Sequence, residues 1–396
     1  MTARPQPAQA RRRRRPRARS PTSPRTSPPR ARRTGSGVTR RRDVASYNRP
    51  APASSARRLA FRTPLPHHVT ASSAQPSGVL KALIAPELAG VDQVIQQRLA
   101  SDVALVNQIA QYIVNAGGKR VRPQLVLLVA GALGFKGPER FELAAVVEFI
   151  HTATLLHDDV VDESDLRRGR QTANAVFGNA ASVLVGDFLY SRAFQMMVSV
   201  ERMRVLEVLA DATNVIAQGE VLQLMNMHDP DITVDDYFRV IRYKTARLFE
   251  ASARLGAILA EADTVAEESC AELGDALGVA FQLVDDLLDY GGSTAELGKN
   301  VGDDLREGKP TYPLLVALER ANASERELLR AVIREGGATQ LEAVLAVIQR
   351  CDALEATRQA ALEHVERGRR CVLALPASTH REALLELLAQ SVARVS

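Results

Sequence analysis

The sequence is poor in the residues and segments that mark several large classes of protein. Its three cysteines, Cys270, Cys351 and Cys371, are odd in number, widely spaced and without a Cys-x-x-Cys pair. They predict neither a disulfide framework nor a cysteine zinc site, and they favour a reducing compartment. The longest apolar run, Leu125 to Phe135, has eleven residues, whereas a helix needs about 20 to cross a bilayer. We therefore expect no membrane-spanning segment.

Acidic residues are almost absent from the first 80 positions. This segment holds nineteen arginines, no lysine and the single acid Asp43, which gives a net charge of +18. The rest of the chain holds 32 basic and 45 acidic residues, a net charge of −13. A proline-rich segment with this composition has too little apolar surface to fold, and its like charges repel. We expect residues 1–78 to form a disordered arm and residues 79–396 to form one helical domain.

The role of the arm has three open interpretations. Its many Arg and Ser residues are typical of a mitochondrial transit peptide, although its prolines would interrupt the amphipathic helix of such a signal. Its charge would suit a tail that binds nucleic acid or an anionic membrane, but the arginine runs lack interleaved aromatic residues for base stacking. The arm would not exist if translation started near Val69 or Val79. We expect a cytoplasmic protein, or a mitochondrial one if the arm is a transit peptide, and no nucleic-acid binding by the folded domain.

Helical spacing of apolar residues dominates the chain after about Val79. Leu143, Val146, Val147 and Ile150, for example, recur at the spacing of one helix face, and strand-like alternation is nearly absent. Loop residues break the pattern at Gly117-Gly118, Gly134 to Pro138, Asp229-Pro230, Gly291-Gly292, Lys309-Pro310 and Gly336-Gly337. We predict an all-α fold, with about ten or more helices packed as a bundle.

Two acidic clusters share the pattern Asp-Asp-x-x-Asp. The first contains Asp158, Asp159 and Asp162, and the second contains Asp285, Asp286 and Asp289. On a helix the first and last aspartate of each cluster lie on one face, a turn apart. Carboxylates crowded beside Leu and Val repel each other and are costly to desolvate unless cations neutralise them. We predict two helix faces that hold Mg²⁺ around a diphosphate, since this ion takes carboxylates, phosphates and water; the alternative is two solvated helix faces.

Basic residues gather near both clusters. The turn Gly117-Gly118 precedes Lys119 and Arg122, which are three positions apart and would face an anionic ligand together. Arg167 and Arg168 follow the first cluster. Guanidinium groups bind phosphate oxygens in pairs, so these arginines would suit a metal-bound diphosphate. The alternative is that they form surface ion pairs with Glu163 and Asp165.

Several of these motifs occur together in one known family. The sequence resembles the trans-prenyl diphosphate synthases over residues 80–396, and within that family it is most similar to the octaprenyl-forming enzymes of bacteria. The stretches that carry the resemblance are Gly117 to Pro123, Glu148 to Gly169, Ala175 to Met197, Gln218 to Thr233, Lys244 to Glu250 and Phe281 to Pro313. The resemblance implies an antiparallel helical bundle around a deep central cavity, usually in a homodimer, with both acidic motifs at the cavity mouth.

The resemblance also implies an activity and its partners. The enzyme would add isopentenyl diphosphate units head to tail to an allylic diphosphate, with farnesyl diphosphate as the expected primer and two to three Mg²⁺ per active site. The product would pass to a membrane prenyltransferase, as in the synthesis of a ubiquinone side chain. The alternatives are a class I terpene cyclase and a non-catalytic regulatory subunit of a heteromeric synthase.

Roles for individual residues follow from the same resemblance. The expected metal ligands are Asp158, Asp162 and Asp285, with Asp159, Asp286 and Asp289 as further catalytic acids and Asp289 as a further ligand. The expected ligands of isopentenyl diphosphate are Lys119, Arg122, His151 and Arg168. The expected ligands of the allylic diphosphate are Arg167, Lys244, Thr245, Gln282, Lys299 and Lys309, of which Lys244 is also expected to be catalytic.

Product length is expected to depend on the helix that bears the first cluster. Ala153 and Thr154, one turn below Asp158, are small where short-chain members of the family place aromatic plugs, so we predict a tunnel that continues downward, with Met197 or Leu209 near its floor. A helix from Glu139 to Glu163 would be about 37 Å long at about 1.5 Å per residue, comparable with an extended chain of some forty carbons. We expect eight isoprene units, with nine or ten as alternatives; close packing of small residues would explain Ala153 and Thr154 without a tunnel.

Overall fold

The computed structural model describes residues 78–114, 117–167, 169–291, 302–336 and 340–393. All of them fall within one compact unit, residues 72–396. The predicted arm lies outside these ranges except for Gly78, so the boundary at residue 79 stays a prediction. Two predicted site residues, Arg168 and Lys299, also lie outside the described residues.

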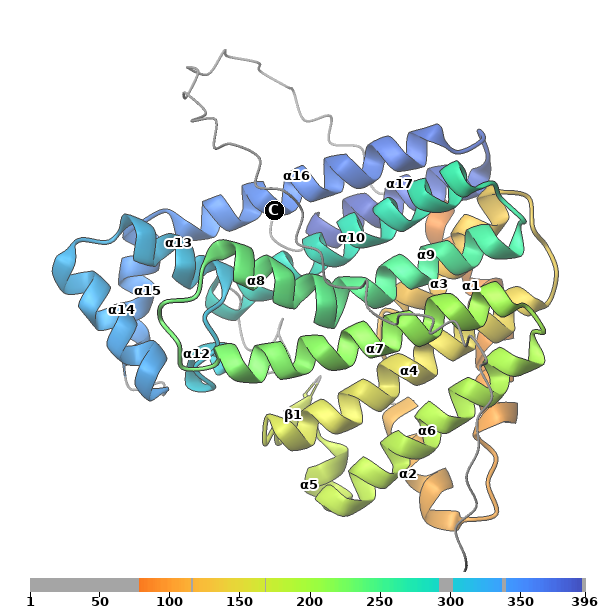
Figure 1. The fold of residues 1–396 in the computed structure, drawn as a ribbon, viewed down its shortest axis with the longest axis horizontal. Helices are drawn as coiled ribbons and strands as arrows, with labels where there is room; N and C mark the ends of the chain where they lie inside the picture. Colours follow the sequence, from red (N-terminus) through yellow and green to blue (C-terminus); the bar gives the residue numbers. More distant parts are fainter. Residues whose placement is uncertain (1–77, 115–116, 168, 292–301, 337–339, 394–396) are drawn as a thin grey trace, which may run out of the picture. The chain divides into compact units, whose positions relative to one another are not determined.

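Helices make up nearly all of the described chain, which confirms the predicted all-α class (Figure 1). The helices before the second acidic cluster are α1 (Val79–Leu99), α2 (Ala104–Val114), α3 (Val121–Ala132), α4 (Glu139–Val161), α5 (Ala173–Phe177), α6 (Asn179–Ser199), α7 (Met203–Asn226), α8 (Val234–Ile241), the π-helix η1 (Arg242–Ala246) and α9 (Arg247–Leu259). They are followed by α10 (Thr264–Gly291), α12 (Asp303–Arg306), α13 (Tyr312–Arg320), α14 (Ala323–Glu335), α15 (Leu341–Arg350), α16 (Ala353–Ala374) and α17 (Thr379–Val392). A small antiparallel hairpin joins β1 (Leu166–Arg167) to β2 (Arg170–Gln171).

Local chemistry fixes several helix boundaries. The predicted loop residues that the structure describes fall between helices or at a helix end, including Gly134 to Pro138 between α3 and α4. Thr233 and Asp236 form a capping box that begins α8, because each side chain bonds to the backbone N–H of the other residue. Pro123 lies in the first turn of α3, where a missing backbone N–H costs nothing, so it does not end the helix.

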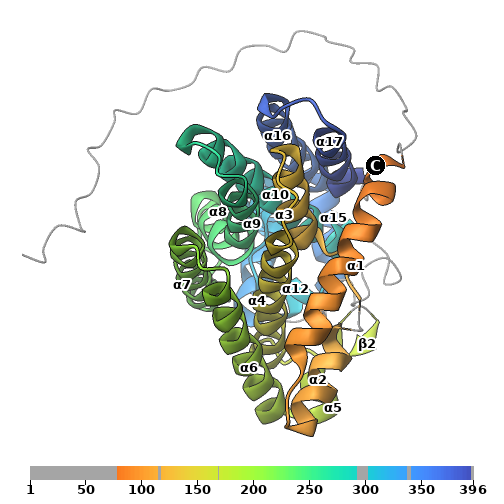
Figure 2. The same cartoon turned by 90° about the vertical axis from the view of Figure 1, so that its right-hand side faces the viewer.

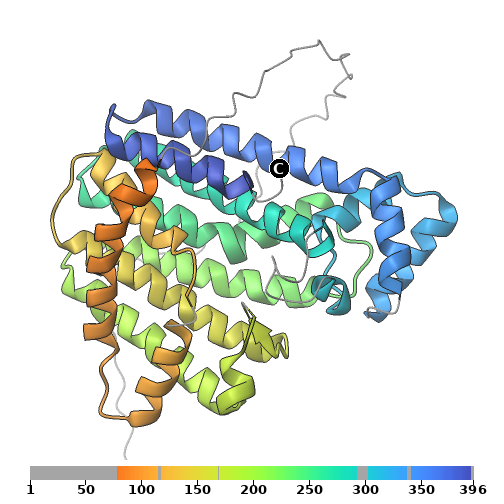
Figure 3. The same cartoon turned by 180° about the vertical axis from the view of Figure 1, so that it is seen from behind.

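The helix α4 lies at the centre of the packing. It contacts α1, α3, α6 and α9, and the end view in Figure 2 shows it between α1 on one side and α6 and α7 on the other. On the far side α1 runs across α3, α4 and α17, against which it packs (Figure 3). The central place of α4 explains its continuous apolar pattern, since it is covered from several directions.

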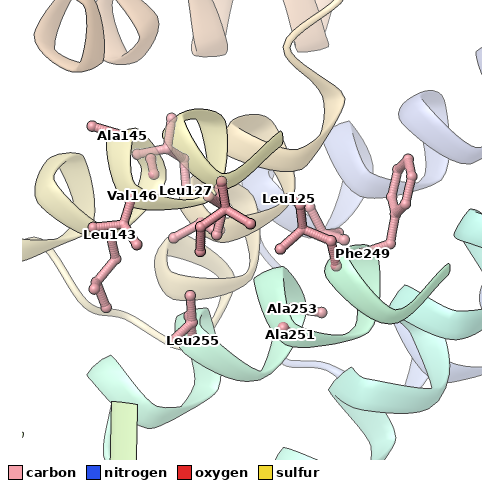
Figure 4. Close-up of a cluster of buried hydrophobic side chains, with 14 of the residues drawn as sticks. Leu125, Leu127, Leu143, Ala145, Val146, Phe249, Ala251, Ala253 and Leu255 are labelled. Atoms are coloured by element: carbon pink, nitrogen blue, oxygen red, sulfur yellow. The ribbon is translucent and has the colours of Figure 1, made fainter. Parts of the chain in front are cut away.

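The main core fills the space between α3, α4 and α9 (Figure 4). Leu125 and Val146 are fully buried there, and Leu125 lies near the small residues Ala251 and Ala253. A Cβ at Gly256 would lie 2.9 Å from the backbone nitrogen of Ala130, so α9 approaches α3 more closely than a side chain would permit. The part of α4 that precedes the first acidic cluster is packed in this core.

None of the described helices combines the length and the low polarity of a membrane span. The three cysteines are buried and form no disulfide. The cysteines agree with the expectation that they form no disulfide framework.

Candidate active site

A cavity of about 1070 Å³ opens between α4, α7, η1 and α10. Its wall includes residues from both acidic clusters and from the predicted basic set. The predicted site residues that line it are Lys119, Arg122, His151, Thr154, Asp158, Asp162, Arg167, Lys244, Thr245, Gln282, Asp285, Asp286 and Lys309. Segments that lie far apart in the sequence therefore meet around one space.

The first acidic cluster presents two carboxylates to the cavity. Asp158 belongs to the last turn of α4, and Asp162 follows as its C-terminal cap residue, so the expected one-turn spacing places both on the cavity side. Each carboxylate meets a lysine: Lys244 Nζ lies 3.7 Å from Asp158 Oδ2, and Lys309 Nζ lies 3.0 Å from Asp162 Oδ2. The lysines supply the opposite charge that such a cluster needs.

Each of these lysines also forms an ion pair with a glutamate. Glu220 Oε2 lies 2.6 Å from Lys244 Nζ, and Glu307 Oε2 lies 2.5 Å from Lys309 Nζ. Burial by itself lowers the pKa of Lys244, but the nearby carboxylates of Asp158 and Glu220 outweigh it and raise this pKa above the usual value. Burial raises the pKa of Glu220 to about 7, against the attraction of Lys244. Lys244 thus stays charged across the physiological range.

Lys244 and Thr245 belong to the π-helix η1, a form of helix that is rare and frequent at functional sites. A Cβ at Gly219 would lie 2.5 Å from the backbone nitrogen of Lys244. Only glycine at that position permits α7 to pack this closely against η1. The contact places Glu220 beside Lys244 and fixes both at the cavity wall.

The second cluster divides into residues with different surroundings. Asp285 lines the cavity. Asp286 is 1% exposed and accepts hydrogen bonds from Tyr237 Oη at 2.6 Å, Gln282 Nε2 at 2.9 Å and the Tyr312 backbone N–H at 3.4 Å. Burial, with the charge of nearby Asp304, raises the pKa of Asp286 to about 7. Asp286 thus belongs to the cavity wall, with its carboxylate oxygens engaged by these three donors.

Asp289 does not lie where the pattern placed it. Its residue is fully buried and does not contribute to the cavity wall, because the start of α12 covers it. The backbone N–H of Asp304 donates to Asp289 Oδ2 at 3.3 Å, and that of Gly302 donates to the Asp289 carbonyl at 3.0 Å. In this structure Asp289 anchors α12.

Asp159 also has a local partner. It is 1% exposed, lies outside the main cavity and accepts a hydrogen bond from Arg167 Nε at 2.7 Å. Burial raises the pKa of Asp159, against the opposing charge of Arg167. Arg167 therefore pairs with neither Glu163 nor Asp165, and its bond to Asp159 holds the β1–β2 hairpin beside the cavity.

The glycine turn before α3 directs two cations into the cavity. Arg120 has a left-handed backbone with φ of 51°, and it separates Lys119 from Arg122. Ion pairs at 3.4 Å with Asp92 and with Glu148 hold the Arg120 side chain. The Arg122 guanidinium lies 4.3 Å from the centroid of the Phe249 ring, a cation–π contact that limits its orientation.

The residues expected to control product length are only partly exposed to the cavity. Thr154 lines it, whereas Ala153 and Met197 are fully buried in the main core and do not. Leu209 is likewise part of that core. The cavity wall runs along α4 from Asp158 past Thr154 to His151 and Glu148, whereas Ala153 itself is packed in the core.

Several cavity residues escaped the sequence interpretation. Glu220, Gln223 and Asn226 lie on one face of α7 at spacings of three, and Glu307 follows α12. Their spacing of three within the stretch Gln218 to Thr233 was a usable signal, because it places polar side chains along one face of a helix. Tyr237 gave no signal, because its bond to Asp286 depends on the tertiary fold.

The carboxylates of the cavity suit a divalent ion that takes its remaining ligand atoms from a bound substrate. Among the described residues no three His, Cys, Asp or Glu side chains are arranged to hold a metal ion by themselves. The carboxylates of Asp158, Asp162 and Asp285 do line one cavity with cationic side chains. Mg²⁺ is usually held by one or two carboxylates, with phosphate oxygens and water as its remaining ligands. The residues therefore fit magnesium bound together with a diphosphate.

Comparisons with known proteins agree with this arrangement. The model of the polyprenyl synthetase family matches residues 103–350. Octaprenyl diphosphate synthase of Escherichia coli is 54% identical over 316 residues, which cover 80% of this chain and 98% of that protein. The all-trans-nonaprenyl-diphosphate synthase (geranyl-diphosphate specific) of Rhodobacter capsulatus is 45% identical over 79% of this chain and 97% of its own length.

A solved structure has the same fold. Polyprenyl synthase from Caulobacter crescentus, in complex with calcium and isoprenyl diphosphate, matches with a TM-score of 0.78 and 45% identity, over 82% of this chain and all of that chain.

Proposed function

Because this chain belongs to the polyprenyl synthetase family, we propose that its cavity binds an allylic diphosphate beside isopentenyl diphosphate and joins them head to tail. The chain is a trans-polyprenyl diphosphate synthase, which lengthens the allylic substrate by repeated five-carbon additions. The observation that carries the assignment of the site is the meeting of both acidic clusters with cationic side chains around one cavity.

Asp158, Asp162 and Asp285 would hold the magnesium ions, two to three per active site. When bound, Mg²⁺ would neutralise the charge that develops on the departing diphosphate. The Caulobacter crescentus structure, solved with calcium and isoprenyl diphosphate, supports a divalent ion in this fold. Asp159, Asp286 and Asp289 would act indirectly, through the buried contacts described above.

The cationic side chains would divide between the two diphosphates. Lys244, Thr245 and Gln282 would bind the allylic diphosphate from the side of η1 and α10, together with Lys309, Arg167 and Lys299. Gln282 is oriented for this role, because its Nε2 donates to Asp286 and its Oε1 accepts from Thr245 Oγ1 at 3.0 Å. Lys119, Arg122 and His151 would bind isopentenyl diphosphate near the glycine turn, together with Arg168.

The reaction would begin with cleavage of the allylic C–O bond, because the ordered cations stabilise the leaving diphosphate more than the bound substrate. The double bond of isopentenyl diphosphate would attack the resulting carbocation. Loss of a proton, with the released diphosphate as the expected acceptor, would regenerate an allylic product. Phe249, Phe281 and Leu155 line the cavity, and apolar walls exclude the water that would quench the cation.

Eight isoprene units are the proposed product length, with farnesyl diphosphate as the primer. The Escherichia coli octaprenyl diphosphate synthase supports this length at 54% identity. The Rhodobacter capsulatus nonaprenyl enzyme, at 45% identity, keeps a nine-unit product as the alternative. Transfer of the product to a membrane prenyltransferase, for a quinone side chain, is proposed on the same basis.

An assay with farnesyl and labelled isopentenyl diphosphate, with and without Mg²⁺, tests the function. We expect magnesium-dependent incorporation and a product that elutes with an octaprenyl standard. A terpene cyclase would convert the allylic substrate without incorporating label. A regulatory subunit would be inactive as a pure homomer, so either result would contradict the proposal.

A homodimer is proposed from an apolar face on α6 and α7. Leu184 and Val198 on α6, and Leu224 and Met225 on α7, are all at least 60% exposed, and the two helices contact each other. A soluble chain rarely leaves such a patch uncovered. In light scattering, Met225→Asp should yield a smaller species than wild type, whereas Val265→Asp, at another exposed valine on α10, should not.

A cytoplasmic location is proposed from the bacterial relatives. The mitochondrial alternative has no support among them. Mass spectrometry of the native N-terminus tests whether the arm exists, and peptides from residues 20–60 would refute a late start.

A further inference from the structure

Two lysines of the cavity share one arrangement. Lys244 joins Asp158 to Glu220, and Lys309 joins Asp162 to Glu307. In each case a lysine lies between an aspartate of the first acidic cluster and a glutamate from a different part of the chain. The glutamate is the nearer partner both times, at 2.6 and 2.5 Å, against 3.7 and 3.0 Å for the aspartates.

Each lysine occupies space beside a carboxylate that is expected to bind a divalent ion. The side chains of Lys244 and Lys309 are 18% and 17% exposed, so water screens their charges only in part. An ammonium group and a divalent ion would compete for the same carboxylate oxygens. Without a second partner, a lysine at this place would move fully onto the aspartate.

The backbone holds each glutamate and lysine in register. The packing of Gly219 against the nitrogen of Lys244 fixes Glu220 beside it. On the other side of the cavity, the Lys309 backbone N–H donates to the Asp304 carbonyl at 2.8 Å. The Gly308 carbonyl accepts a hydrogen bond from the His228 backbone N–H at 2.9 Å. Backbone contacts next to each lysine–glutamate pair therefore fix the positions from which the two side chains meet.

We propose that Glu220 and Glu307 are positioning residues: Glu220 holds Lys244 at 3.7 Å from Asp158, Glu307 shares Lys309 with Asp162, and both thereby keep these aspartates available to divalent ions. The proposal rests on the proposed metal site. It assigns the glutamates a role that acts through the lysines, and it separates them from direct metal ligands.

The test is metal binding by the full chain at pH 8, with Mn²⁺ alone as the probe and the EPR signal of free Mn²⁺ as the readout. Glu220→Gln should weaken binding about two- to tenfold, because the freed lysine competes for Asp158. Lys244→Gln should bind Mn²⁺ at least as tightly as wild type. The double variant should then match Lys244→Gln, since the glutamate has nothing left to position.

An equal loss from Glu220→Gln with and without Lys244 would overturn the proposal, because the glutamate would then act by its own charge or as a ligand. An unchanged affinity in Glu220→Gln would also overturn it. If Glu220→Gln does not fold, the variants Glu307→Gln and Lys309→Gln and their double variant form an independent double-mutant cycle. Glu366→Gln, which breaks an exposed pair with Arg369 on α16, is the matched control. Wild-type chain that binds no Mn²⁺, either alone or with inorganic diphosphate present, would refute the metal site itself.

Discussion

Replacement of the buried carboxylate in the second cluster, Asp286→Asn, should change how stability depends on pH. In the wild type this side chain is surrounded by donors: the Tyr237 hydroxyl, the Gln282 amide and the Tyr312 backbone N–H. Asparagine would place its own NH₂ group among them. One donor would then lose its acceptor, at a cost of about 1–3 kcal/mol.

The magnitude of the pH effect follows from the raised pKa. Burial moves the pKa of Asp286 from 3.8 to about 7 in the folded chain, so the folded state binds a proton that the unfolded state has already released. Stability from this group is therefore fully present below pH 4 and is lost as the pH rises through 7. Between pH 5 and pH 8 the free energy of unfolding of the wild type should fall by about 2.5 kcal/mol because of this group, and Asp286→Asn should not show this decrease.

The assay is urea unfolding followed by circular dichroism at pH 5 and pH 8, in EDTA and at one protein concentration. Asp286→Asn should be clearly less stable than wild type at pH 5, and the difference should shrink or reverse at pH 8. Glu366→Gln is the control, because this carboxylate lies on α16 in a half-exposed pair with Arg369, and the variant should keep the pH profile of the wild type. A stability difference for Asp286→Asn that is the same at both pH values would refute the reasoning.

Three further substitutions test other parts of the site. Asp158→Ala should lower turnover by orders of magnitude with an unchanged circular dichroism spectrum, since this side chain faces the cavity; an active variant would contradict its role. Gly219→Ala should cost about 1–3 kcal/mol in urea unfolding and reduce turnover, because its Cβ would lie 2.5 Å from the Lys244 backbone nitrogen; wild-type values for both would be inconsistent with the close helix contact. Ala153→Phe should shorten the product in chromatography, and a full-length product would rule out a tunnel past this residue.

The sequence alone was sufficient for the fold class and for much of the cavity wall. Helical spacing identified the helices because a buried helix face must be apolar whatever it packs against. The helix expected from Glu139 to Glu163 ends at Val161, with Asp162 as its cap. The one-turn spacing of Asp158 and Asp162 placed both in the cavity, since a turn of helix fixes relative direction without any tertiary contact.

Spacing failed where a second segment covers the helix. Asp285 and Asp289 have the same separation as Asp158 and Asp162, but α12 lies over Asp289 and removes it from the cavity wall. Asp159 and Asp286 are just as acidic in sequence as their neighbours, yet Arg167 and Tyr237 engage them inside the protein. A one-dimensional pattern cannot show which carboxylates receive buried donors.

The sequence by itself thus determined which residues carry charge, which helix faces are apolar and which carboxylates are a turn apart, because these depend on local geometry. Only the tertiary structure decided which carboxylates remain accessible to a ligand. It also decided that Glu220 and Glu307 form ion pairs with Lys244 and Lys309. These outcomes depend on contacts between segments as distant as α4 and the loop after α12, and electrostatic energies change steeply with distances that only the folded chain sets.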